Sequence, residues 1–121
     1  MIRMAMVLAA GRGERMRPLT DTLPKPLIEV AGRSMLDRIL DRLQEHGVRN
    51  VVINVHHLGE QIARHVGPGR AHIVREDRLL ETGGSVRNAL PLLGNDPFFV
   101  VNGDGLWTDA ATPLLRRLES A

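Results

Sequence analysis

Apolar runs alternate with helical patterns along almost the whole chain. The apolar runs predict strands at residues 5–10, 50–55, 72–75 and 98–102. Between and after them, apolar side chains recur at the spacing of a helix face. The apolar positions of the four predicted helices are Met35, Leu36, Ile39, Leu40 and Leu43; Leu58, Ile62 and Val66; Val86, Ala89, Leu90 and Leu93; and Leu114, Leu115 and Leu118. This alternation predicts an α/β fold: a Rossmann-like, mostly parallel sheet with helices on both faces and right-handed crossovers.

Small residues mark the ends of the predicted helices. Ser34 is expected to cap the first helix and Gly47 to end it. The run Gly67-Pro68-Gly69 ends the second helix. Before the third helix, either Thr82 or Ser85 could act as the cap.

The strongest chemical signal is VLAAGRGERMRPLTDTLPKP, residues 7–26. An apolar strand meets Gly11 and Gly13, which allow the backbone to turn sharply and to approach a ligand. Exposed N–H groups in such a turn bind anions, and arginines beside it hold phosphate oxygens bidentately. Lys25 lies between two prolines that stiffen the backbone around it. The arginines of the motif are Arg12, Arg15 and Arg17. The pattern favours a site for several phosphates over an ordinary turn whose arginines are only solvated.

The spacing of this motif excludes two common phosphate loops. A dinucleotide fingerprint would need a third glycine where Met16 stands. A P-loop would need Gly-Lys-Ser/Thr, but Gly13 is followed by Glu14. The motif is therefore a different kind of phosphate loop, and a dinucleotide-dependent oxidoreductase is disfavoured.

A second polar cluster follows the last predicted strand. Because ligands gather at the carboxyl ends of parallel strands, residues 11–25 and 103–109 are expected at the same edge of the sheet. Asp104 emerges at the end of the buried run 98–101, where a carboxylate can hold Mg²⁺. The alternative is that Asp104 only forms an Asx turn.

Histidines and asparagines near the second strand give a weaker signal. His56 and His57 are adjacent and lack a second cluster at metal-ligand spacing, so loop polarity is favoured over a metal site. Asn54 and His56 lie at the carboxyl end of the second predicted strand and could line the pocket. Trp107 is expected to pack rather than to bind.

Composition limits the class of protein. With 121 residues, 43% hydrophobic and 25% charged, the chain suits one modest globular core. A net charge of +2, from 16 basic and 14 acidic residues, and only two Phe and one Trp argue against nucleic-acid binding. The chain has no cysteine and no run long enough to cross a membrane, so a cytoplasmic enzyme without membrane association is expected.

The motifs together resemble the signature of the sugar-1-phosphate nucleotidyltransferases. The resemblance is carried by LAAGRGERMRPLT followed by PKP, by LETGG at residues 80–84, by VNGD at 101–104 and by WTD at 107–109. These enzymes join a nucleoside monophosphate to a sugar phosphate and release pyrophosphate. The resemblance implies UTP and N-acetylmuramate 1-phosphate as substrates. The alternative is guanylyl transfer to mannose 1-phosphate.

The resemblance also implies roles for individual residues. Arg15 and Lys25 are the expected catalytic residues, since they would stabilise the phosphates, and Asp104 is the expected ligand of the cofactor Mg²⁺. Glu81, Thr82 and Gly83 are expected to contact the nucleobase. The expected nucleotide-binding residues are Leu8, Ala9, Ala10, Gly11, Gly13, Glu81, Thr82, Gly83 and Asn102. No general base is required, because the attacking phosphate is already ionised.

The family's catalytic domain is considerably longer than this chain. Residues 1–121 are therefore expected to form its nucleotide-binding N-terminal part, without the C-terminal sugar-binding part. In that case the exposed edge of the shortened sheet could support self-association. A nucleotide-binding module without turnover remains the alternative.

Overall fold

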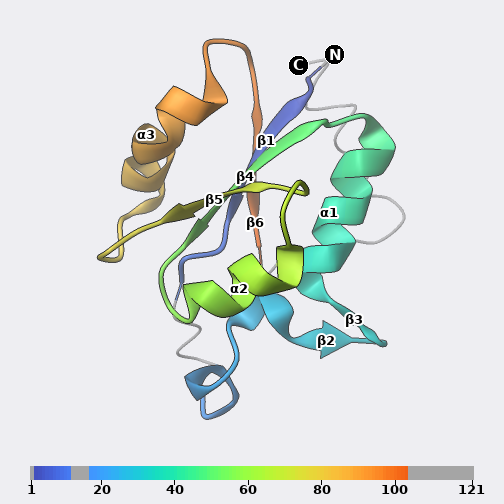
Figure 1. Cartoon of the computed structure of the whole chain (residues 1–121), viewed down its shortest axis with the longest axis vertical. Coiled ribbons are helices and arrows are strands. Elements are labelled where there is room, and N and C mark those ends of the chain that lie inside the picture. Colours follow the sequence, from blue (N-terminus) through green and yellow to red (C-terminus); the bar gives the residue numbers. More distant parts are fainter. Residues whose placement is uncertain (1, 12–16, 104–121) are drawn as a thin grey trace.

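The computed structural model describes residues 2–11 and 17–103, and its centre is a four-stranded parallel sheet. The strands are β1 (Met4–Leu8), β4 (Asn50–Val55), β5 (His72–Arg75) and β6 (Phe99–Asn102). They lie in the order β5-β4-β1-β6, and all three neighbouring pairs are parallel (Figure 1). The predicted strands and the parallel sheet are confirmed. β1 and β6 are shorter than expected, because pairing of β1 stops at Leu8 and that of β6 starts at Phe99.

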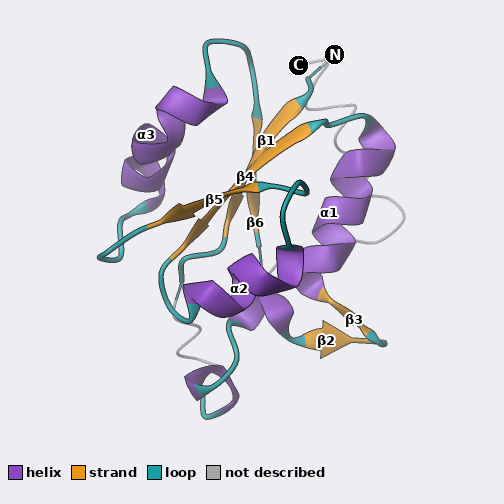
Figure 2. Ribbon diagram, viewed as in Figure 1, coloured by secondary structure: helices purple, strands orange, loops and turns teal. Residues whose placement is uncertain are grey.

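Helices cover both faces of the sheet, as expected (Figure 2). On one face, α1 (Met35–His46) and α2 (Gly59–Val66) pack on alternate residues of the strands, such as Ala5 and Val7. On the other face, α3 (Thr82–Leu93) packs on Met6 and Val52. The two residue sets alternate along β1, which fits a strand buried on both sides. The predicted helix around Leu114–Leu118 lies outside the described residues.

The ends of α1 and α2 follow the predicted signals. The Ser34 hydroxyl accepts a hydrogen bond from the Asp37 amide at 3.0 Å and so caps α1. Gly47 ends α1 with a φ of 106°, a left-handed conformation that glycine adopts without steric cost. Gly67 follows the last residue of α2.

The start of α3 differs from the prediction. Its N-cap is Glu81, which makes no side-chain capping bond, so the expected capping by Thr82 or Ser85 was wrong. Thr82 is already helical, and Ser85 is buried in the first turn together with the later residues Ala89 and Leu93. The buried face therefore follows an i, i+4, i+8 row, and Leu90, expected in the core, is 44% exposed.

The hairpin before α1 was not predicted. The short strands β2 (Glu29–Val30) and β3 (Arg33–Ser34) form an antiparallel hairpin before α1. Its two-residue turn has positive φ at both Ala31 (52°) and Gly32 (84°). Two-residue strands carry too little hydrophobic pattern to be recognised in a sequence.

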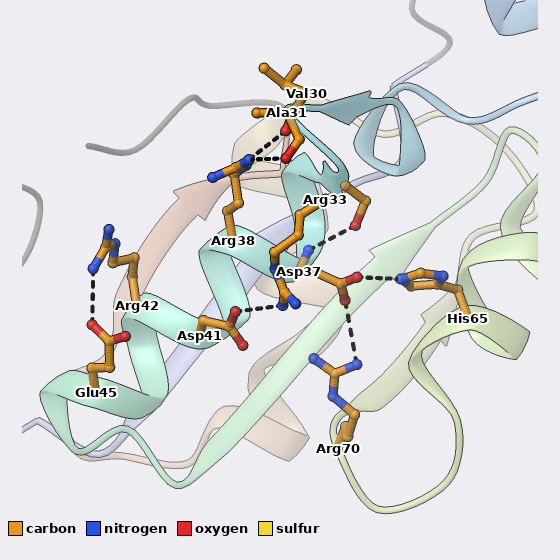
Figure 3. Close-up of polar contacts among 11 residues, drawn as sticks. Val30, Ala31, Arg33, Asp37, Arg38, Asp41, Arg42, Glu45, His65 and Arg70 are labelled. Atoms are coloured by element: carbon orange, nitrogen blue, oxygen red, sulfur yellow. Dashed lines mark hydrogen bonds and ion pairs between the residues drawn. The ribbon is translucent and has the colours of Figure 1, made fainter. Parts of the chain in front are cut away.

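Polar contacts tie the outer side of α1 to its neighbours (Figure 3). Asp37 accepts hydrogen bonds from His65 at 2.9 Å and from Arg70 at 3.4 Å, which links α1 to α2 and to the loop after it. Arg38 donates to the carbonyl oxygens of Val30 and Ala31 in the hairpin. Partial burial acts to raise the pKa of Asp37, but the hydrogen bonds and charges of its partners outweigh it and leave the pKa below its usual value.

Within the described part of the chain, no helix is long and apolar enough to cross a membrane.

Candidate nucleotide-binding site

A cavity of about 720 Å³ opens at the carboxyl ends of β1, β4 and β6. Its walls come from the end of β1 and the turn after it, from β4, from β6, from a short helix that begins at Lys25 and from the segment that leads into α3. The lining residues are Leu8, Ala9, Ala10, Gly11, Lys25, Pro26, Asn54, Leu79, Leu80, Glu81, Thr82, Ser85 and Asn102. This is the edge of the sheet at which ligands of parallel α/β proteins gather.

The ends of β1 and β6 lie side by side in this cavity. Leu8 is opposite Asn102 in the parallel ladder, and the Gly103 amide donates to the Leu8 carbonyl oxygen at 2.8 Å. The turn at Gly11 therefore starts at the same edge as the segment after β6, as the sequence predicted. Asp104 itself lies outside the described residues.

A buried side-chain network holds the other side of β1. The Ala9 amide donates to Asn54 Oδ1 at 2.8 Å, and Asn54 Nδ2 donates to Glu76 Oε2 at 3.2 Å. Asn54 and Glu76 are only 2% and 6% exposed. Asn54 was expected near the pocket, but Glu76 was missed. Its position directly after β5, at the carboxyl end of a strand, is the signal that could have identified it.

The Lys25 segment is held by its prolines and by a hydrogen bond from α2. Lys25 begins the 3-10 helix η3 (Lys25–Leu27) after Pro24, and both flanking prolines are buried while Lys25 is half-buried. Upstream, the Gln61 side chain of α2 donates to the Thr22 carbonyl oxygen at 2.8 Å. These contacts give Lys25 a defined position at the rim of the cavity.

The two adjacent histidines, His56 and His57, form hydrogen bonds with backbone carbonyl oxygens near the cavity. His57 Nε2 donates at 2.6 Å to the carbonyl oxygen of Thr20, which is buried in the 3-10 helix η2 (Leu19–Asp21). His56 Nδ1 donates to the Glu76 carbonyl oxygen at 2.8 Å. Since a carbonyl only accepts, these bonds fix the ring nitrogen that carries the proton. His56 thus supports the backbone of Glu76, and His57 supports that of Thr20.

The first turn of α3 forms the remaining wall. The first N–H groups of a helix lack intrahelical partners and carry partial positive charge, so they can serve a ligand. Here these amides belong to Thr82, Gly83 and Gly84, and the first helical bond runs from the Ser85 amide to the Glu81 carbonyl oxygen at 2.8 Å. A Cβ on Gly83 would meet no described atom within 4 Å, which leaves the backbone open to close approach.

Most of the predicted site residues are brought together. Those that line the cavity are Leu8, Ala9, Ala10, Gly11, Lys25, Glu81, Thr82 and Asn102. Gly83 follows Thr82 in α3 but is not part of the lining. Gly13, Arg15 and Asp104 lie outside the described residues, and Arg17, from the same motif, pairs with Asp21 at 2.9 Å on the surface.

Within residues 2–11 and 17–103, no group of three or more His, Cys, Asp or Glu side chains could hold a metal ion. Asn102 lines the cavity two positions before Asp104 in the sequence and offers an amide oxygen. Mg²⁺ accepts such oxygens as ligands, and Asp104, the predicted carboxylate ligand, lies outside the described residues.

Comparison with known proteins gives consistent matches. The family model described as the MobA-like NTP transferase domain matches residues 5–121. The chain is 53% identical over 108 residues to a curated N-acetylmuramate alpha-1-phosphate uridylyltransferase from Neisseria meningitidis serogroup B, covering 84% of this chain and 47% of that protein. It is 44% identical over 117 residues to a curated protein of the same name from Caulobacter vibrioides, covering 90% and 48%.

Solved structures share the fold. HddC from Yersinia pseudotuberculosis, solved in complex with GMP-PN, superposes with a TM-score of 0.77 at 24% identity, over 98% of this chain and 55% of that one. At this identity the likeness concerns the fold alone. The chain spans about half the length of the curated relatives it matches.

Proposed function

Because this chain belongs to the MobA-like NTP transferase domain family, we propose that it carries the nucleotide-binding part of a sugar-1-phosphate nucleotidyltransferase. The observation that carries the proposal is the cavity itself. It gathers the turn after β1, the half-buried Lys25 and the first turn of α3 at one sheet edge. We further propose UTP and N-acetylmuramate 1-phosphate as substrates, which the names of two curated relatives support.

In the proposed complex, the triphosphate lies along the turn that begins at Gly11. The backbone amides of this turn and the Arg15 guanidinium bind the β- and γ-phosphates, while Lys25 neutralises the phosphates nearer the sugar. The nucleobase lies against residues 81–83, where glycine leaves the backbone accessible. Mg²⁺, held by Asp104 and phosphate oxygens, would reduce the negative charge at the α-phosphate.

The reaction then needs little beyond charge and position. An ionised oxygen of the sugar phosphate forms a bond to the α-phosphorus, the bond between that phosphorus and the bridging oxygen breaks, and pyrophosphate leaves. Both reactants are anions, so their repulsion is the main barrier for the protein to lower. Lys25 and Arg15 do this by holding positive charge beside the phosphates, and no side chain has to remove a proton.

Titration calorimetry on the wild-type chain tests binding directly. UTP with Mg²⁺ is expected to bind. GTP and NAD are titrated separately, so that their affinities can be compared with that of UTP. Pyrophosphate release upon addition of N-acetylmuramate 1-phosphate or mannose 1-phosphate then distinguishes transfer from binding without turnover. Preferred binding of NAD would indicate an oxidoreductase, and failure of every nucleotide to bind a folded sample would refute the proposal.

Lys25 offers a more specific test, since it is the only lysine among the 121 residues. Bound UTP should protect its side chain from an amine-acylating reagent, with the N-terminal amine as an internal reference. Lys25→Ala should weaken UTP binding roughly tenfold to a hundredfold, the range for a hydrogen-bonded charge pair. Arg49→Ala is the matched control, because Arg49 is exposed just before β4, at the opposite edge of the sheet. Equal effects of the two substitutions would contradict the role of Lys25.

Two further parts of the proposal concern the location of the protein and its oligomeric state. We propose a cytoplasmic location, and self-association through β6, the outer strand of the described sheet. Val100 on β6 is 45% exposed, which leaves apolar surface there. Size-exclusion chromatography of the wild-type chain over a range of concentrations checks the second point.

A further inference from the structure

We propose that Asn54 and Glu76 form a positioning pair for the nucleotide-binding turn. The inference rests on the proposed function for its ligand, but its geometry is independent of it. Neither side chain needs to contact the nucleotide, because both act through the backbone at Ala9, which leads into the turn at Gly11.

The Asn54 side chain extends the pairing of β1 at the point where the sheet ends. The ladder between β1 and β4 stops at the pair Leu8 and Asn54. One residue further, the Ala9 amide donates to the side-chain oxygen of Asn54 at 2.8 Å, and Ala9 is 2% exposed. A buried amide without this acceptor would carry a desolvation cost, so the bond fixes the path by which the chain leaves β1.

Glu76 fixes the orientation of the Asn54 amide. Because the Ala9 N–H can only donate, the oxygen of Asn54 must face it, and the Asn54 nitrogen then faces Glu76 Oε2 at 3.2 Å. The reverse orientation would place an oxygen against the carboxylate and an NH₂ group against the Ala9 amide. The carboxylate therefore permits one orientation only.

The backbone of Glu76 is itself held at both ends. Its amide donates to the Val55 carbonyl oxygen at 2.8 Å, and its carbonyl oxygen accepts from His56 Nδ1 at 2.8 Å. Its second carboxylate oxygen, Oε1, is buried and has no partner among the described residues. Asn54 is thus the described donor on which the buried carboxylate depends, and the two side chains form one unit.

Two variants that exchange the amide and the carboxylate between positions 54 and 76 test whether Asn54 and Glu76 act together. Asn54→Asp keeps an acceptor for the Ala9 amide but places two carboxylates against each other. Adding Glu76→Gln restores a donor, since the glutamine NH₂ group can face the introduced carboxylate with the polarity of the bond reversed. Asn50→Asp is the matched control, because it makes the same chemical change at the exposed amino end of the same strand.

The readouts are UTP affinity, hydrogen exchange of the Ala9 amide, and the thermal midpoint. Asn54→Asp should weaken UTP binding about tenfold, the loss expected for one buried hydrogen bond. Exchange at Ala9 should be about tenfold faster than in wild type. The double variant should return both quantities to within about threefold of wild type, and Asn50→Asp should change neither.

The outcomes separate this inference from the proposed function. Wild-type affinity in Asn54→Asp, or a double variant that is no better folded and binds no better than Asn54→Asp, overturns the positioning role. If the wild-type chain binds no nucleotide, the proposed function fails and the nucleotide part of this inference fails with it. Exchange at Ala9 then decides the remaining claim: unchanged exchange in Asn54→Asp overturns it, and rescued exchange in the double variant supports it.

Discussion

Substitution of Gly103 by alanine should destabilise the protein at the edge of the candidate nucleotide-binding cavity. A Cβ at this position would lie 2.9 Å from the Leu8 carbonyl oxygen, 3.3 Å from the Ala9 Cβ and 3.4 Å from Val7 Cγ1. The Leu8 oxygen cannot move away freely, because it already accepts the Gly103 amide at 2.8 Å. The end of β6 must therefore shift by several tenths of an ångström relative to β1.

The expected cost follows from this contact. Overpacking of a buried site costs about 1–3 kcal/mol of the free energy of unfolding. For a chain of this size, that corresponds to a fall in the thermal midpoint of about 4–12 °C. Affinity for UTP should fall as well, because the shift displaces Asn102 in the cavity wall.

Thermal unfolding followed by circular dichroism measures the effect, and Gly11→Ala is the control. A Cβ at Gly11 meets no described atom within 4 Å. Gly11→Ala should therefore change the free energy of unfolding by less than about 1 kcal/mol. If Gly103→Ala melts within about 2 °C of wild type, the close junction of β1 and β6 is not as tight as this reasoning requires.

Three further substitutions test the surroundings of α1. Ser34→Ala removes the helix cap and should cost about 1 kcal/mol in denaturant unfolding, and no loss would contradict the capping role. Ala31→Asn should raise stability by about 0.5–1 kcal/mol, because asparagine tolerates the positive φ of this turn better than alanine, and a decrease would argue against that backbone conformation. Asp37→Asn should lower the thermal midpoint at pH 7. Since the folded pKa of Asp37 lies below its unfolded value of 3.8, the contribution of its carboxylate is complete above that pH and is lost as the pH falls through the folded pKa. The difference from wild type should therefore shrink on acidification, and a constant difference between pH 7 and pH 3 would contradict the role of the carboxylate.

Local signals allowed much of the fold to be predicted. The strands at 50–55 and 72–75 and the caps of α1 at Ser34 and Gly47 coincide with the structure, because apolar runs, a capping hydroxyl and a left-handed glycine act within a few residues. The burial of α3 was less predictable. Leu90 is helical and apolar but faces solvent, whereas Ser85 is buried, since the rotation of the helix depends on how it packs on Met6 and Val52.

The site shows the same division. Gly11, Lys25 and the pair Glu81 and Thr82 were predicted because each lies in a contiguous pattern, and all of them line the cavity. Glu76 carried no such pattern. It belongs to the site only because β5 lies beside β4 and brings it within hydrogen-bonding distance of Asn54, a contact between residues 22 positions apart.

The strand order β5-β4-β1-β6 has a consequence for how binding preferences can change. β4 pairs with β1, and β5 pairs with the far side of β4. The chain then returns through α3, and β6 pairs with the other side of β1. The opening beside β1 thus arises from the route of the chain, not from any single side chain. Residues in the loops around that opening can be exchanged while the packed layers beneath remain intact. Exchanging loop residues between relatives is therefore expected to change the ligand preference while the scaffold stays the same.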